Sequence, residues 1–330
     1  MNFIVSEATF LRYFCPLVIE GNKRGIKSRF FLGRSGKYND CYREETKRQI
    51  QEFCLNNNVD VFSLKEIENF PGLTFSIEGV DVDATNSSHF NVSITYMTDF
   101  SLSYENYVTK VDHVIMPSKF FAEKYNKLSD KNLYLGSPKY DLSILKDDVI
   151  KKYKLSSGKK SLIIFPRIRD LSKINILEIY DTIESLGYEI IVKTRGKDKV
   201  PKAYRRGRYF EDESWFPHTT MELIEAVDFV VNFGSTSIKE CALMKTPIIN
   251  FDIKPFPLVL DELYNFDYCE KFSSDVDSEK LKNSIRNLTK SNLDSCFNLA
   301  IQKYLFDPKD TSSRILDRVL YQQEKVVKSD

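Results

Sequence analysis

Short apolar runs alternate with longer amphipathic segments along the chain, and this alternation predicts a parallel α/β protein. In the first half, the runs that predict strands are 2–5, 28–32, 59–64, 91–97, 111–117 and 133–136, and the segments that predict helices are 10–22, 44–57 and 118–127. In the second half, the predicted strands are 161–165, 188–193, 229–233 and 247–251, and the predicted helices are 174–186, 220–226, 235–244, 291–305 and 312–326. Strands separated by helices favour a doubly wound parallel sheet in each half.

The alternation is interrupted once, between residues 141 and 160, where the chain is charged and shows no clear strand. A linker between two domains fits best there. We therefore expect an N-terminal Rossmann-like domain at 1–145 and a second Rossmann-like domain at 146–310. The last predicted helix lies in 311–330 and is a candidate for packing back on the N-terminal domain.

Composition narrows the protein class. Of 330 residues, 42% are hydrophobic and 29% are charged, which is typical of a packed globular protein and excludes a disordered one. The formal charge of +1 disfavours a nucleic-acid binder that acts through bulk charge. The sequence shows no apolar window of membrane-spanning length and no secretory signal, so we expect a cytoplasmic location. The six Cys form no CxxC pair, and the three His have no metal-ligand spacing, which disfavours a zinc module and a histidine metal centre and leaves a carboxylate site as the alternative. Basic loops can take the place of Mg²⁺, so we expect no metal and no cofactor.

Charge is balanced overall but not locally. Residues 151–208 hold sixteen Lys or Arg against six acids, a net charge of +10. A second basic stretch, 12–37, holds seven Lys or Arg against the single acid Glu20. Such asymmetry suggests an anionic ligand or surface, and the alternative is that these charges only solvate helix faces.

Loops that follow the strands of a parallel sheet are where ligands bind, and one such loop is distinctive. The predicted strand 229–233 runs into Gly234, Ser235, Thr236 and Ser237, and Glu240 follows one helical turn beyond Thr236. A glycine allows close backbone approach, and hydroxyl and amide groups at a helix start can bind a diphosphate. The alternative is that Ser235 or Thr236 only caps the helix and Glu240 is a surface acid.

The stretch 232–252 resembles the nucleotide-binding signature of GT-B glycosyltransferases and their relatives. It is similar to lipid-linked N-acetylglucosaminyltransferases, CDP-glycerol glycerophosphotransferases and UDP-N-acetylglucosamine 2-epimerases. Residues 112–118 and the turn 135–141 agree with the same families in order. The resemblance implies two Rossmann-like domains facing a cleft, with Gly234, Ser235, Thr236 and Ser237 on the donor phosphates and Glu240 on the ribose.

Two loops depart from these families. Arg167 follows the strand 161–165 where the epimerases have a His-Arg-Arg-Glu-Asn pattern, and the missing His and Glu disfavour epimerase chemistry. Lys193 and Arg195 stand where glycerophosphotransferases place Arg-x-His-Pro, so the charge is kept while the His is lost. We expect Arg167, Lys193 and Arg195 to contact donor phosphates. For the general base, Asp99 and Glu7 rank equally, since each follows a predicted strand.

These observations predict a glycosyltransferase that moves a sugar from a nucleotide-activated donor to a surface-glycan or lipid-linked acceptor. Its expected partners are the nucleotide-sugar, the acceptor and an anionic membrane surface, with no nucleic acid. The basic 12–37 stretch suggests peripheral attachment to the inner face of the membrane. The alternatives are a CDP-glycerol-type polyol-phosphate transferase, then a UDP-sugar 2-epimerase, or a non-catalytic nucleotide-binding module.

Overall fold

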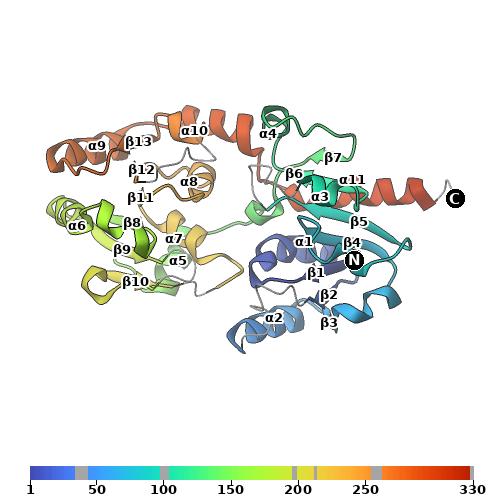
Figure 1. Cartoon of the computed structure of the whole chain (residues 1–330). Helices are drawn as coiled ribbons and strands as arrows, with labels where there is room; N and C mark the ends of the chain where they lie inside the picture. The colour runs from blue at the N-terminus through green and yellow to red at the C-terminus, as the bar shows by residue number, and fades with distance from the viewer. Residues whose placement is uncertain (34–43, 97–103, 195–198, 212–213, 254–261, 328–330) are drawn as a thin grey trace. The chain divides into compact units, whose positions relative to one another are not determined.

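The chain folds into two α/β units (Figure 1). The structure is a computed structural model that describes residues 1–33, 44–96, 104–194, 199–211, 214–253 and 262–327. Unit 1 comprises Met1–Leu142 and Lys303–Asp330, and unit 2 comprises Ser143–Gln302. The C-terminal segment of unit 1 thus begins at Lys303 rather than at the expected residue 311.

Unit 1 is built on a seven-stranded, fully parallel sheet with the strand order β3-β2-β1-β4-β5-β6-β7. Its strands are β1 (Asn2–Val5), β2 (Arg29–Leu32), β3 (Asp60–Ser63), β4 (Gly72–Ile77), β5 (His89–Ile94), β6 (His113–Met116) and β7 (Asn132–Tyr134). From β1 the chain winds outward to β3 and then returns to lay β4 on the other side of β1. The topological switch point of this sheet therefore lies between β1 and β4.

The helices of unit 1 include one from the end of the chain. They are α1 (Leu11–Lys23), α2 (Glu44–Asn56), α3 (Tyr104–Val108), α4 (Lys119–Lys124) and α11 (Thr311–Val327), with short helical turns η1 (Ala8–Phe10), η3 (Leu64–Asn69), η4 (Val82–Ala84) and η5 (Pro138–Tyr140). A salt bridge of 2.6 Å between Arg24 and Asp317 joins α1 to α11. The Asp141 carboxylate accepts a hydrogen bond of 2.6 Å from the Ser312 amide, so it caps the first turn of α11. The turn 135–141, which resembles a family motif, thus holds the start of α11.

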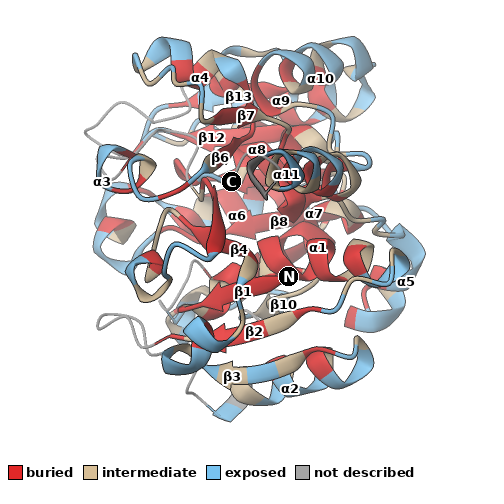
Figure 2. Cartoon of the chain, turned by 90° about the vertical axis from the view of Figure 1, so that its right-hand side faces the viewer, coloured by how far each residue is buried: buried red, intermediate tan, exposed pale blue. Residues whose placement is uncertain are grey.

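One face of the unit 1 sheet is an aromatic core. Phe3 of β1 is fully buried and contacts Phe14 of α1, Phe30 of β2 and Phe75 of β4, with ring centroids 5.2, 5.8 and 5.3 Å away. Figure 2 shows these central strands as buried. Phe3, Phe30 and Phe75 therefore form an apolar layer on this face of the sheet.

The opposite face of the same central strands is polar. The strand register aligns Asn2 with Thr74 and Asn91, and it aligns Ser76 with Ser93. All five side chains are buried, and so is His89, two residues before Asn91. The Thr74 hydroxyl lies 3.3 Å from Asn2 Nδ2 and 2.9 Å from His89 Nδ1. Within the described residues, His89 Nε2 has no hydrogen-bond partner. Burial lowers the pKa of His89, and the charge of Glu68 only partly offsets this effect.

Unit 1 should therefore lose stability as the pH falls. A histidine whose folded-state pKa is lowered binds its proton more readily when unfolded, so the free energy of unfolding drops as the pH falls through about 6.5. Urea unfolding at pH 7.5, 6.5 and 5.5 should show a smaller pH dependence for His89→Gln than for the wild type. The Met1 amine, whose pKa burial lowers to about 6, acts in the same direction in both proteins. The difference in pH dependence between the wild type and His89→Gln therefore reports on His89 alone. If the free energy of unfolding changes equally with pH in both proteins, this account is wrong.

Unit 2 carries a six-stranded, fully parallel sheet with the order β10-β9-β8-β11-β12-β13. The strands are β8 (Lys160–Ile164), β9 (Glu189–Lys193), β10 (Arg208–Phe210), β11 (Phe229–Asn232), β12 (Ile248–Phe251) and β13 (Cys269–Phe272). The helices are α5 (Lys146–Tyr153), α6 (Ile176–Ser185), α7 (Thr219–Ala226), α8 (Ile238–Leu243), α9 (Ser278–Lys290) and α10 (Asp294–Ala300), with turns η6 (Ile168–Lys173), η7 (Lys202–Tyr204), η8 (Leu263–Asn265) and η9 (Ile301–Leu305). The switch point of this sheet lies between β8 and β11.

The main core of unit 2 joins one face of its sheet to α6 and α9. Alternate residues of β8, β9, β11 and β12 face this core, including Ile163, Val192, Val231 and Ile249. Because side chains alternate along a strand, Lys193, Asn232 and Asn250 face the other side of the sheet. The register aligns Lys193 with Ile164, and it aligns Asn232 with Asn250. Polar side chains therefore lie on this second face at the carboxyl end of the sheet.

Several elements differ from the sequence prediction. The segment 141–160, expected to be a linker, contains the helix α5, which is amphipathic and packs against α7. The sequence prediction also missed β4, β10, β13 and α9. The expected helix 291–305 is instead α10 followed by the π-helical turn η9. Residues 73–77 of β4 alternate between apolar and polar side chains, as the predicted strand 91–97 does, so the sequence carries a strand signal here that the prediction did not use.

Candidate functional site

The candidate site of unit 2 lies at the switch point of its sheet. β8 and β11 are hydrogen-bonded neighbours, so the loops that follow them start next to each other at the carboxyl ends of the strands. The loop after β8 begins with Phe165, Pro166 and Arg167, and the loop after β11 begins with Phe233 and Gly234. β9, on the other side of β8, ends in Lys193. Ligands of open parallel sheets bind at this place because the loops diverge there and leave room.

Two asparagines hold the turn after β11. Asn250 Oδ1 accepts a hydrogen bond of 2.9 Å from the Gly234 amide, and Asn232 Oδ1 accepts one of 3.1 Å from the Ser235 amide. The Asn232 side chain also donates to Asn250 Oδ1 at 3.2 Å. Gly234 has φ of +66°, a conformation that side chains disfavour, so the glycine suits this turn.

A tyrosine completes this network. The Tyr264 hydroxyl donates to the Ser235 carbonyl at 2.6 Å and accepts from Asn232 Nδ2 at 2.8 Å. Tyr264, Asn232 and Asn250 are all buried. The sequence analysis missed all three side chains. The signal available in the sequence was the polar end of each strand, because Asn232 and Asn250 each come directly after a short apolar run.

The turn presents its later residues to solvent. Thr236 is exposed and Ser237 is half-buried, whereas Gly234 and Ser235 are buried. The hydroxyls of Ser235 and Ser237 lie 3.1 Å apart. Because the amides of Gly234 and Ser235 bond to the asparagines, the groups of this turn that face outward belong to Thr236 and Ser237.

The other predicted donor-binding residues have different environments. Arg167 is exposed, and in the described part of the chain no acid pairs with its guanidinium. Lys193 is buried, and its Nζ donates to the Thr194 carbonyl at 2.8 Å. Glu240, on α8, is also buried, with 4% of its surface exposed. Arg195 lies outside the described residues.

Unit 1 places a predicted base candidate at its own switch point. Glu7 follows β1, is half-buried and accepts a hydrogen bond from Thr9 at 3.2 Å. Its neighbour Ser6 donates a hydrogen bond to Asp81, in the loop after β4. Asp81 is a carboxylate at the same edge that the sequence analysis missed. The other predicted base, Asp99, lies outside the described residues.

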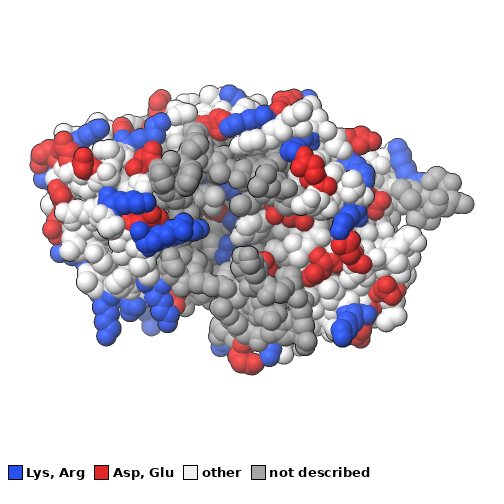
Figure 3. All heavy atoms as spheres, viewed as in Figure 1, with Lys and Arg blue, Asp and Glu red and all other residues white. Residues whose placement is uncertain are grey.

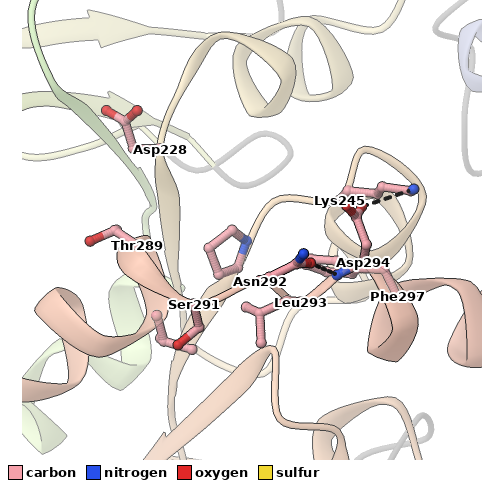
Figure 4. Close-up of a pocket in the computed structure, with 10 residues that line it drawn as sticks. Asp228, Lys245, Thr289, Ser291, Asn292, Leu293, Asp294 and Phe297 are labelled. Carbon is pink, nitrogen blue, oxygen red and sulfur yellow. Dashed lines mark hydrogen bonds and ion pairs between the residues drawn. The ribbon is translucent and has the colours of Figure 1, made fainter.

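A pocket lies at the opposite end of the unit 2 strands from the Gly234 turn. It has a volume of about 320 Å³ and its wall includes Asp228, Thr289 and Phe297 (Figure 4). Lys245, at its rim, forms a salt bridge of 3.1 Å with Asp294. Asp228 and Pro247 stand immediately before β11 and β12, so this pocket is at the amino ends of the strands and is separate from the turn at Gly234.

Acids neutralise part of the charge of both basic stretches. In the 12–37 stretch, Lys23 and Arg24 both pair with Glu20, and Lys27 pairs with Asp60 at 2.7 Å. In unit 2, exposed Lys and Arg side chains gather over β10 and the segment before it (Figure 3). Of these, Arg206 pairs with Asp181 and Glu184, and Arg208 pairs with Glu189. β10 is an edge strand, and charged edge strands resist pairing with other chains.

The described residues form neither a metal site nor a membrane-spanning helix. Within the described segments, no three His, Cys, Asp or Glu side chains are grouped as they would be around a metal ion. Among the helices of the described residues, none combines the length and apolar character needed to cross a membrane.

Comparison with known proteins identifies the fold. No protein-family model matches the sequence, and no curated protein matches it either. Solved structures do match over nearly the whole chain. UDP-GlcNAc 2-epimerase from Methanocaldococcus jannaschii, solved in complex with UDP-GlcNAc and UDP, has a TM-score of 0.63 and 13% identity, covering 97% of this chain and 99% of that one.

Glycosyltransferases match to a similar degree. The glycotransferase of kitacinnamycin has a TM-score of 0.60 and 9% identity, with 98% of each chain covered. A glycosyltransferase from Rickettsia africae has a TM-score of 0.55 and 11% identity, with 96% of this chain and 97% of that chain covered. The two parallel sheets and these similarities together show that the chain has the GT-B fold, with two Rossmann-like units.

Proposed function

We propose that the protein is a glycosyltransferase that takes a sugar from a nucleotide-activated donor. Unit 2 binds the donor at its switch point, and unit 1 binds the acceptor, a surface glycan or a lipid-linked sugar. The observation that carries the proposal is that Arg167 and the Gly234–Ser237 turn lie in the loops that follow two neighbouring strands, β8 and β11, at this switch point. The structural neighbours include an epimerase solved in complex with UDP-GlcNAc and UDP, and two glycosyltransferases, which supports a nucleotide-sugar as the donor.

The chemistry of the site fits a diphosphate. Arg167 offers planar, paired donors on a side chain that no described acid neutralises. Thr236 and Ser237 add hydroxyl groups on a turn that buried side chains hold in place. In glycosyl transfer the diphosphate leaves with developing negative charge, and fixed donors stabilise that charge. We propose Lys193, Arg195 and Glu240 as further donor-site residues, and Glu7 or Asp99 as the base that receives the acceptor proton.

The acceptor and membrane parts of the proposal rest on charge. The 12–37 stretch is compensated by Glu20 and Asp60, so it offers less free positive charge than its composition suggested. Before β10, the exposed Lys199, Lys202 and Arg205 pair with no described acid, and they are the candidates for contact with an anionic surface on the inner face of a membrane. Flotation with vesicles containing anionic lipid tests this part separately from sugar transfer.

A thermal-shift panel of UDP, GDP, CDP, CMP, dTDP and their sugars tests the proposal. A ligand that binds only the folded state raises its stability, by about 2.7 kcal/mol at a hundred times its Kd. We expect one nucleotide class to raise the melting temperature selectively, and the sugar of that nucleotide then to be transferred to an added acceptor.

The alternatives give different outcomes of the same experiment. Transfer of a polyol phosphate from a CDP-polyol identifies a polyol-phosphate transferase. Isomerised sugar in the absence of an acceptor identifies a 2-epimerase. Nucleotide binding with neither transfer nor donor hydrolysis identifies a binding module. If no nucleotide shifts the melting temperature, the proposal is wrong at its first step.

A further inference from the structure

We infer that Asn232, Asn250 and Tyr264 form a positioning lock for the nucleotide turn, which leaves Thr236 and Ser237 as the residues of the turn that contact the ligand. This inference rests on the proposed function and refines it. The lock acts through the main chain of Gly234 and Ser235 and does not itself touch the donor. The phosphate contacts expected of the Gly234 and Ser235 amides are accordingly absent from this assignment.

The lock bonds to two amides and one carbonyl of the turn's main chain. Asn250 holds the Gly234 amide, Asn232 holds the Ser235 amide, and Tyr264 holds the Ser235 carbonyl. These three main-chain groups belong to consecutive peptide units, so the path of the turn is fixed between the end of β11 and the start of α8. The Ser235 carbonyl also lies 3.3 Å from Asn232 Nδ2.

The orientation of the Asn250 amide follows from its neighbours. Both the Gly234 amide and Asn232 Nδ2 donate to the same atom, Asn250 Oδ1, so that atom must be the oxygen. Asn232 in turn must present its nitrogen to Asn250 and its oxygen to the Ser235 amide. Asn232 and Asn250 therefore each have one orientation that makes these bonds, and in it Asn250 Nδ2 has no hydrogen-bond partner among the described residues.

The side chains of the lock are buried, which makes their hydrogen bonds costly to break. Asn232 and Asn250 are 0% and 1% exposed, and Tyr264 is 3% exposed. Water does not reach these bonds readily, so removing one partner leaves a buried group unpaired, which costs more than the bond itself contributes. A rigid turn also loses little entropy when a ligand binds, because the turn is already ordered in the free protein.

The test compares two buried tyrosines. Tyr264→Phe removes the hydroxyl that bonds to the turn. Tyr180→Phe removes a hydroxyl that also donates to a main-chain carbonyl of unit 2, that of Tyr204 at 3.1 Å, and Tyr180 is part of the core on the other face of the sheet. Both variants should lose similar stability on urea unfolding. For the best-binding member of UDP, GDP, CDP and dTDP, Tyr264→Phe should raise Kd by about three- to tenfold, and Tyr180→Phe by less than twofold.

Amide hydrogen exchange tests the lock without a ligand. The Gly234 and Ser235 amides should exchange slowly in the wild type and in Tyr180→Phe, and faster in Tyr264→Phe and Asn250→Ala. Asn250→Asp keeps an oxygen acceptor for the Gly234 amide, so it should restore much of the protection that Asn250→Ala loses. Thr236→Ala and Ser237→Ala should weaken nucleotide binding while leaving this protection unchanged.

The outcomes separate this inference from the proposed function. If the wild type binds a nucleotide and Tyr264→Phe binds it equally well, the inference is overturned and the proposed function stands. If the wild type binds no nucleotide, the proposed function fails, and the ligand-contact part of the inference fails with it. Fast exchange of both amides in the wild type overturns the lock itself.

Discussion

Gly207→Ala should lower the free energy of unfolding by about 3 kcal/mol. Gly207 has φ of +65°, which costs an alanine about 1 kcal/mol, and a Cβ there would lie 2.1 Å from the Ile190 carbonyl oxygen. That oxygen belongs to the main chain of β9, so it cannot swing aside as a side chain would. β10 begins at the next residue, so its pairing with β9 must shift to relieve the contact. Urea unfolding of the wild type and the variant measures the loss.

Gly187→Ala is the matched control for this prediction. Gly187 also has a positive φ, +80°, and also precedes a strand, but a Cβ there would meet nothing within 4 Å. Gly187→Ala should therefore lower the free energy of unfolding only by the cost of a positive φ for alanine, about 1 kcal/mol. If the two variants are equally stable, the close approach of Gly207 to β9 does not constrain the unit 2 sheet.

The sequence indicates the fold because most strands are buried on both faces. Runs such as 162–165 and 229–231 are apolar, and the intervening helices have one apolar face, so the parallel α/β class follows from pattern alone. The failures have different reasons. β4 presents Thr74 and Ser76 to a buried polar layer, and β10 is a three-residue edge strand with exposed Arg208 at its start. β10 is too short to show a strand pattern, whereas β4 alternates between apolar and polar residues and could have been predicted.

The candidate site could be located but not built from sequence. A glycine and three hydroxyl residues after an apolar run mark the turn, and strand order then places it beside Arg167. The lock could not be found in this way because Asn232, Asn250 and Tyr264 come from three segments and act through main-chain groups. In the same way, the pairing of Ser6 with Asp81 requires that β1 and β4 be neighbours, and β4 was not predicted.

Arg167→Ala should weaken binding of the nucleoside diphosphate by about ten- to a hundredfold. A hydrogen bond between charged groups contributes about 1.5–3 kcal/mol, and each 1.4 kcal/mol is a factor of ten in Kd. Arg167 is exposed and pairs with no described acid, so the variant breaks no ion pair and should unfold at the same urea concentration as the wild type. Titration calorimetry with UDP, GDP, CDP and dTDP measures the loss, and Arg167→Lys should recover only part of it because a lysine cannot bind in bidentate fashion.

Arg286→Ala controls for the change in net charge. Arg286 is an exposed residue of α9 that bonds only weakly to Asn283, at 3.4 Å, so its removal should leave Kd within twofold of the wild type. Raising the salt concentration should narrow the gap between wild type and Arg167→Ala, because screening weakens a contact between an exposed guanidinium and phosphate. Equal affinities of wild type and Arg167→Ala at low salt would remove Arg167 from the donor site. The turn at Gly234 would then have to hold the diphosphate without help from the loop after β8.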